Sequence, residues 1–301
     1  MNLLPARNWA LCALAFGLVS TAASADDTAE APQKYLLQYK FAVGEILRYD
    51  VRHATDVRTT IDGTTEKSET RSDSVKAWKV TDVLPSGEME FMHVVEWVRM
   101  TNDSGNGAGR QYDSRKDAQP PRGFEQAARA VGVPLSLVRI APDGEVVLRQ
   151  EKHPQPKPSE DLPITLLLPK EPIAVGAKWS RSYEVPAKRK NGTTMQIQTR
   201  RVATLRSVTS GVATIDFEYQ ILTPVEPYVR AALVERLAQG TVRFDVERGR
   251  ILSQEQNVDK RVLGFASEAS SMHFVSRLSE RLLDSPDERG KIQQTSANIA
   301  P

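Results

Sequence analysis

The sequence predicts a mainly β fold of the α+β class, in which two similar halves build large, curved antiparallel sheets and each half adds one short amphipathic helix. Three observations lead to this prediction. Segments rich in Val, Ile, Thr and Tyr alternate with Gly, Asn and Asp turns along most of the chain. Two short stretches carry apolar residues at helical spacing. The order of turn, helix and closing hairpin occurs twice.

The composition is that of a globular protein. The chain has 301 residues, 40% hydrophobic and 26% charged, with 40 Lys and Arg against 38 Asp and Glu. These values exclude disorder over most of the chain and a membrane protein with several spans. They also argue against a nucleic-acid partner, because proteins that follow phosphate backbones carry a clear excess of positive charge.

Residues 1–25 have the three parts of a signal peptide. Arg7 gives a positive start, an apolar run follows from Trp9 to Val19, and Ala23-Ser24-Ala25 offers a small-residue cleavage site. Cleavage there leaves a mature chain that begins at Asp26 and has no transmembrane segment. The protein is therefore expected to be exported, to the periplasm or the extracellular side of a bacterial envelope.

The mature chain contains no thiol. The only cysteine, Cys12, lies within the predicted signal, so the exported protein has neither a disulfide nor a cysteine metal ligand. An exported chain of this size without disulfides is more typical of bacteria than of eukaryotic secretion. Residues 26–34 and 284–301 carry few apolar residues and are predicted to be disordered tails.

The first β-rich half spans residues 35–152. A long loop is predicted over 101–121, and an amphipathic helix follows with Phe124, Ala127, Ala128 and Val131 on one face. The Asp62-Gly63 pair is typical of a hairpin turn. The predicted strands of this half are Tyr35–Phe41, Ile46–Asp62, Glu66–Val83, Glu88–Met100, Leu135–Ile140 and Glu145–Gln150.

A Pro-rich connector over residues 153–163 leads to the second β-rich half, residues 164–283. This half repeats the order of the first, with an Asn191-Gly192 turn and a second amphipathic stretch that carries Val229, Ala232, Leu233 and Leu237. Its predicted strands are Ser180–Val185, Val212–Ile221, Thr241–Val246, Arg250–Val258 and a further strand, Ser271–Leu282. The repeated order suggests an internal duplication.

If the halves are equivalent, Trp179 opens its strand where Leu47 opens the first. Phe91 and Phe217 are then expected at matching positions, each flanked by acidic residues that face water. Those flanking acids are Glu88, Glu90, Asp216 and Glu218.

No catalytic, metal or cofactor site is predicted. The chain lacks the serine-hydrolase, metalloprotease, phosphate-loop and calcium-loop motifs. Its four histidines, His53, His93, His153 and His273, share no metal-ligand spacing. A hydrolase that uses strand-borne histidines or carboxylates remains an alternative from a different functional class.

Six basic residues lie near the Asn191-Gly192 turn. The sequence favours a solvated hairpin whose edge is protected by positive charge, and the alternative is peripheral contact with an anionic membrane. The six residues are Arg181, Lys188, Arg189, Lys190, Arg200 and Arg201.

The apolar inner face of the sheet is the candidate ligand-binding surface. Two outcomes stay open: the helices fill this face as ordinary core, or they leave an apolar pocket. The candidate residues are Phe91, Phe124, Val131, Phe217, Leu233, Leu237 and Phe244.

The segment Leu168–Trp179 contains Pro169, Pro172, Ile173, Val175, Gly176 and Trp179. It resembles the Pro-x-x-Pro-[Ile/Val]-x-Val-Gly-x-x-Trp opening of a long strand in uncharacterised secreted bacterial β-rich proteins. Tyr39–Gly44 with Arg48-Tyr49 is similar to it in the first half. The resemblance implies helices against a curved antiparallel sheet, similar to periplasmic lipoprotein carriers, and implies no activity.

The sequence therefore favours a non-enzymatic, exported binding or scaffolding protein of the cell envelope, whose sharpest version binds a lipid or other apolar ligand. The partner is an envelope component or an apolar ligand, without a cofactor or metal. The alternative is a structural or protein-interaction module with a filled core.

Overall fold

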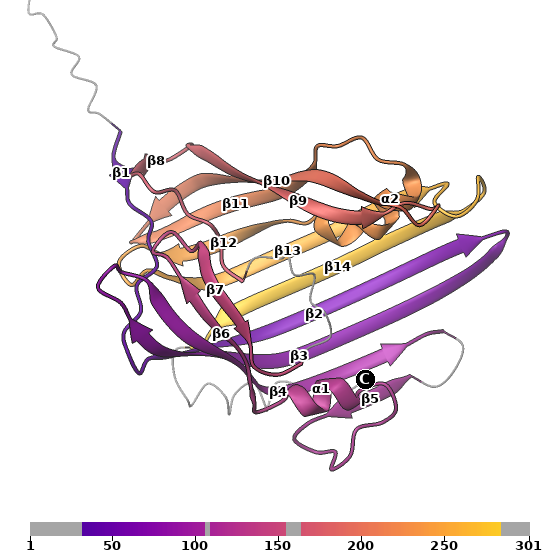
Figure 1. The fold of residues 1–301 in the computed structure, drawn as a ribbon, viewed down its shortest axis with the longest axis horizontal. Coiled ribbons are helices and arrows are strands. Elements are labelled where there is room, and N and C mark those ends of the chain that lie inside the picture. Colours follow the sequence, from indigo (N-terminus) through magenta and orange to yellow (C-terminus); the bar gives the residue numbers. More distant parts are fainter. Residues whose placement is uncertain (1–31, 106–108, 155–163, 284–301) are drawn as a thin grey trace, which may run out of the picture. The chain divides into compact units, whose positions relative to one another are not determined.

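The computed structural model describes residues 32–105, 109–154 and 164–283. The fold is mainly β, with one large antiparallel sheet and two short α-helices, as the sequence predicts (Figure 1). The predicted signal peptide (1–25), the C-terminal tail (284–301) and most of the connector (153–163) lie outside the described residues. The N-terminal tail was predicted to reach residue 34, but Lys34 already pairs in a short strand.

The first half contributes β2 (Ile46–Ile61), β3 (Thr64–Val83), β4 (Met89–Asp103), β5 (Arg110–Asp113), α1 (Glu125–Ala130), β6 (Pro134–Ile140) and β7 (Val146–Glu151). The second half contributes β9 (Lys178–Lys188), β10 (Thr194–Thr209), β11 (Val212–Ile221), α2 (Pro227–Ala232), the 3₁₀ turn η1 (Val234–Arg236), β12 (Gln239–Asp245), β13 (Arg250–Leu263) and β14 (Ser271–Leu282). The short strands β1 (Lys34–Tyr35) and β8 (Ile173–Ala174) open the two halves and pair with each other.

The large sheet joins both halves without a break. Its order is β7-β6-β4-β3-β2-β14-β13-β12-β11-β10-β9, and β5 adds to β4 (Figure 1). Every strand pairing in this sheet is antiparallel. Most join strands that follow each other in the chain. The two exceptions are β2 with β14, which connects the halves, and β4 with β6, which encloses β5 and α1. One prediction is wrong here: the loop predicted over 101–121 contains β5 and the end of β4.

The opening turns of the two halves make the same backbone contacts. Gly44 N–H donates to the Val80 carbonyl (3.0 Å), and Gly176 N–H donates to the Leu205 carbonyl (2.7 Å). In return Val80 N–H donates to Glu45 (2.9 Å), and Leu205 N–H donates to Ala177 (3.0 Å). Val80 of β3 and Leu205 of β10 are therefore equivalent positions.

The strand registers extend this equivalence. Leu47 pairs with Trp78, and Trp179 pairs with Ala203, each two residues before the equivalent position. The expected match between Leu47 and Trp179 is confirmed. The tryptophan of each pair lies on a different strand: Trp78 is on β3, and Trp179 is on β9. The two halves therefore place the large side chain on opposite members of the strand pair.

The expected match between Phe91 and Phe217 is wrong by two residues. Phe91 pairs with Val80, whereas Leu205 pairs with Ile215. Ile215 is thus the counterpart of Phe91, and Phe217 lies one inward position further along β11. The predicted inward face is correct for Phe91 and Phe217, which are both buried, and Glu218 is exposed as expected. Glu90 does not face water freely, because its side chain is only 16% exposed and pairs with Arg139.

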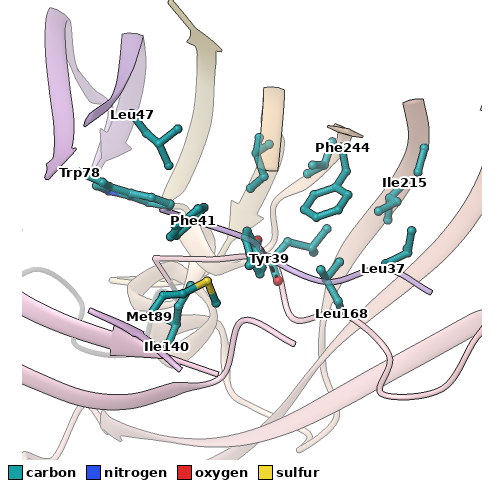
Figure 2. Close-up of a cluster of buried hydrophobic side chains, with 14 of the residues drawn as sticks. Leu37, Tyr39, Phe41, Leu47, Trp78, Met89, Ile140, Leu168, Ile215 and Phe244 are labelled. Atoms are coloured by element: carbon teal, nitrogen blue, oxygen red, sulfur yellow. Dashed lines mark hydrogen bonds between the residues drawn. The ribbon is translucent and has the colours of Figure 1, made fainter. Parts of the chain in front are cut away.

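One large core lies on the inner face of the sheet and contains residues from both halves. Figure 2 shows Leu37, Tyr39 and Phe41 on an extended segment among side chains that include Trp78, Ile215 and Phe244. A second extended segment contributes Leu166 and Leu168. The Tyr39 hydroxyl connects the two, since it donates to the Leu166 carbonyl and accepts from the Leu166 N–H, both at 3.1 Å.

These extended segments, and not the helices, cover the main core. Residues 36–41 were predicted to continue a strand, but only Lys34 and Tyr35 pair in a ladder. The helices pack at the sides: Val229 and Leu233 join a small cluster with Ile197. The reason is length, because each α-helix has six residues and the larger area is reached by a chain in extended form.

The closing turns of both halves touch this cover. A Cβ on Gly249 would lie 2.5 Å from the Gln38 carbonyl oxygen, and one on Gly144 would lie 2.6 Å from the Tyr39 ring. Both glycines have positive φ, so any side chain there is strained as well as crowded. The turns therefore hold the cover in position.

Candidate functional site

A cavity of about 290 Å³ lies on the inner face, between the main core and a smaller apolar cluster made by β13, β14 and η1. Strands of both halves contribute to it, and Ile164 and Thr165 of the second extended segment complete the wall. The cavity is lined by His53, Thr55, Lys76, Trp78, His93, Ile164, Thr165, Arg201, Tyr219, Glu235, Ala238, Gln254, Gln256, Val258, Phe274, Ser276, Leu278 and Glu280.

Strand alternation explains this mixed lining. Every second residue of β3 faces inward, so Lys76 follows the buried Val80 and Trp78 on the same face. In the same way Arg201 of β10 shares a face with Leu205 and Ala203. The inner face is thus apolar in the main core, and it changes to charged and amide side chains at the cavity.

One cation of the cavity is neutralised. Lys76 Nζ lies 2.6 Å from a carboxylate oxygen of Glu280 on β14, and both side chains are largely buried. The ammonium also lies 5.2 Å from the centre of the Tyr49 ring and 5.3 Å from that of Trp78, within the range of cation–π attraction.

The second cation, Arg201, is only 6% exposed. Its guanidinium carbon lies 4.4 Å from the centre of the Phe217 ring and 5.1 Å from that of Tyr219. Its Nε is buried and finds no hydrogen-bond partner among the described residues. Burial raises the pKa of the Tyr219 phenol, and the positive charge of Arg201 opposes this rise.

Two histidines line the cavity in different surroundings. Burial, with help from the charges of Lys76 and Arg149, lowers the pKa of His93 to about 3, so its ring is neutral at physiological pH. His53 is exposed, and its Nε2 lies 2.9 Å from Ser276 Oγ. Partial desolvation of the ring by the surrounding side chains lowers the pKa of His53, and the charge of Glu235 opposes this shift. Because His53 and Glu235 are both exposed, they mark the side on which the cavity opens.

The predicted apolar site is divided by the fold. Phe91, Phe217 and Phe244 meet in the main core, while Leu233 belongs to the cluster beside α2. Phe124 and Val131 pack beside α1 with Val98 and Tyr112, and Leu237 is half-buried beyond η1. None of the seven predicted residues lines the cavity. The aromatic residues of the strands fill core, and the cavity lies one step further along the same strands.

The basic cluster at the Asn191-Gly192 turn is also divided. Arg181 lies 2.5 Å from Glu145 and Lys190 Nζ donates to the Ala266 carbonyl, so both remain on the surface. Arg200 donates to Gln220 on the outer face. Arg201 is the member that the sequence placed wrongly. The alternation Ile197, Thr199, Arg201 along the buried side of β10 is the signal that predicts its true position.

Two further predictions concern metals and membranes. Among the described residues, no group of three His, Cys, Asp or Glu side chains is placed to hold a metal ion. Within the same ranges no helix is long and apolar enough to span a membrane. His273, one of the four histidines, instead pairs with Asp259 at 2.8 Å on the neighbouring strand.

Comparisons with known proteins add little to this geometry. No family model matches the chain, and no curated protein matches its sequence. A solved structure of lipovitellin, described as showing lipid–protein interactions, is similar at a TM-score of 0.41 and 10% identity over 81% of this chain. The chain spans 25% of the length of that lipovitellin. DynF, from the dynemicin biosynthesis pathway of Micromonospora chersina, is similar at a TM-score of 0.21 and 7% identity, over 86% of this chain and 89% of DynF. Both TM-scores are too low to establish a shared fold.

Proposed function

We propose that this protein binds a small amphipathic molecule in the inner-face cavity and acts as an exported, non-enzymatic binding protein of the bacterial envelope. The observation that carries the proposal is the cavity itself, about 290 Å³ in volume and lined by both apolar and polar side chains. Its size is near the lower end of the range for small-molecule sites, roughly 300–1,000 Å³. Export is supported by the signal-peptide pattern of residues 1–25.

The lining favours an amphipathic ligand over a purely apolar one. Trp78, Val258 and Phe274 offer an apolar wall, and Gln254 and Gln256 face the same space. A purely apolar ligand would bury these amides without hydrogen bonds, which is unfavourable. A ligand with an apolar body and a polar head satisfies both kinds of surface.

Native mass spectrometry of the gently purified protein tests the proposal, since a retained ligand appears as an added mass. Gln256→Trp places a large side chain in the cavity, whereas Glu255→Trp changes the neighbouring exposed residue of β13. We expect the first change to remove the added mass and the second to keep it. Retention of the same ligand by folded Gln256→Trp would contradict the proposal.

A second candidate function rests on the contact between His53 and Ser276. A serine hydroxyl 2.9 Å from a histidine nitrogen is the first requirement for a hydrolytic nucleophile. However, Thr55 Oγ1 lies 3.3 Å from the same nitrogen and competes for it. Labelling by a fluorophosphonate that is lost in Ser276→Ala would support this alternative, and an unlabelled protein would exclude it.

A further inference from the structure

Arg201 has a position that calls for an anion. Its side chain is buried on the inner face of β10 and lines the cavity. Its guanidinium lies against two aromatic rings, those of Phe217 and Tyr219, which are nearly perpendicular to each other. Neither ring face supplies a conventional hydrogen-bond acceptor for the N–H donors of this planar group.

No acid of the described residues pairs with Arg201. Glu280 also lines the cavity, but its carboxylate pairs with Lys76 at 2.6 Å. Glu235, the other carboxylate of the lining, is exposed on the side where the cavity opens. A buried charge without a partner is unfavourable, and folded proteins almost always pair it. The missing partner is therefore expected to come from a bound molecule.

A second unpartnered donor lies in the wall of the cavity. Trp78 Nε1 is buried and has no hydrogen-bond acceptor among the described residues. It lines the same space as Arg201 and, with Phe274 and Leu278, belongs to its apolar wall. A ligand with an oxygen-rich head and an apolar body supplies an acceptor for the Arg201 guanidinium and contacts for the wall.

We infer that the cavity binds a compact amphiphile whose anionic head, a carboxylate or phosphate, pairs with the Arg201 guanidinium while its apolar body packs against Trp78 and Phe274. This inference rests on the proposed function and specifies the class of ligand. Arginine suits the role because its planar donors match the oxygens of carboxylate and phosphate groups. The volume of about 290 Å³ limits the body to a short or medium chain.

Isothermal titration of the full mature chain with sodium decanoate and with decanol tests this inference, because the two probes share a chain and differ in the charge of the head. We expect decanoate to bind at least ten times more tightly. In Arg201→Met this preference should disappear through loss of decanoate affinity, with decanol binding unchanged. Arg200→Met, on the adjacent outward position that bonds Gln220, should keep the preference.

The outcomes separate the inference from the proposed function. Equal binding of decanoate and decanol to the unmodified protein would overturn the anionic head and leave ligand binding intact. Binding of neither probe would overturn both proposals. A preference that survives in Arg201→Met would also overturn the inference.

Folding and ligand source need their own measurements. Thermal unfolding shows whether Arg201→Met folds, and without ligand this variant should melt no lower than the unmodified protein, because it loses an unpaired buried charge. Decanoate should raise the melting temperature of the unmodified protein only.

Decyl phosphate, compared with decanoate, identifies the head of the ligand. Tighter binding of the phosphate indicates a lipid headgroup, and tighter binding of decanoate indicates a fatty acid. Equal binding of decyltrimethylammonium would overturn the anionic assignment.

Discussion

Lys76 and Arg201 occupy equivalent positions in the two halves, yet among the described residues only Lys76 has an acidic partner. Each lies four residues before the position that bonds the opening turn of its half, and each cation lies over two aromatic rings. The difference comes from the neighbouring strand β14. β14 pairs with β2 and brings Glu280 to Lys76.

The second half lacks this neighbour. β9, the counterpart of β2, lies at the end of the strand order and pairs only with β10. In the part of the chain that the structure describes, no strand beyond β9 brings an acid to Arg201. One extra strand thus converts two similar halves into a neutralised side and a side with an unpaired cation. The comparison shows how a repeated fold acquires a single binding position without a change in its core pattern.

The largest expected effect concerns the ring beneath Arg201. Phe217 is 3% exposed and belongs to the main core, so Phe217→Ala should lower the free energy of unfolding by roughly 3–5 kcal/mol. Glu218→Ala, on the adjacent outward position, should lower it by less than about 1 kcal/mol. Urea unfolding followed by tryptophan fluorescence measures both. If Glu218→Ala is the more damaging change, the strand phase of β11 is wrong.

The next effect tests the neutralised side directly. Glu280→Gln removes the partner of Lys76, and both side chains are less than a fifth exposed. Leaving one charge of a buried pair without its partner should cost about 3 kcal/mol, which urea unfolding measures. The double variant Lys76→Met with Glu280→Leu should recover most of this loss, because it removes both charges. Equal destabilisation of the single and double variants would show that packing, not charge, is responsible.

The turns, β11 and Arg201 show what the sequence can and cannot predict. The Asp62-Gly63 and Asn191-Gly192 turns and the phase of β11 follow from local rules. The basic residues around Arg201 favour an exposed position for it, whereas alternation along β10 places it on the inner face. The cluster of basic residues in the sequence points to the surface, and the alternation of inward positions along the strand points to the interior. The cavity is predicted only from the second pattern.

The cover of the core could not be predicted by local rules. Tyr39 and Leu166 are hydrogen-bonded at a separation of 127 residues, and neither segment has a strand partner that would reveal it. Extended chain without a ladder has no periodicity beyond that of a strand. The helices had a clear pattern, so the sequence assigned them a role that the extended segments perform.

The third prediction uses pH to examine His93, which lies on the Lys76 side of the cavity. The unfolded chain takes up a proton near the ordinary pKa of 6.5, but the folded ring does so only at about 3. The stability that the neutral His93 ring contributes is therefore fully present above about pH 7, and it is lost as the pH decreases from 6.5 to 3. The expected slope is about 1.4 kcal/mol for each pH unit.

Urea unfolding at several pH values measures this slope. His93→Leu fills the position with an apolar side chain and removes the titrating ring. The stability of this variant should therefore fall less steeply over the same range. The difference between the two proteins isolates the histidine from the carboxylates, which titrate in both. Parallel curves would show that His93 does not gain its proton on unfolding.

The smallest expected effect is the outer counterpart of the Lys76–Glu280 pair. Arg71 Nη2 lies 2.9 Å from Asp56 on the neighbouring strand, a distance close to that of the buried pair, but both side chains are 44% exposed. Water solvates each charge well without its partner, so Asp56→Asn should change the free energy of unfolding by less than about 0.5 kcal/mol. Salt should reduce even this difference, since exposed charges are screened. If urea unfolding shows Asp56→Asn to be as damaging as Glu280→Gln, then burial does not distinguish the two pairs. The burial of the unpaired Arg201 charge would then give no energetic reason to expect a bound anion.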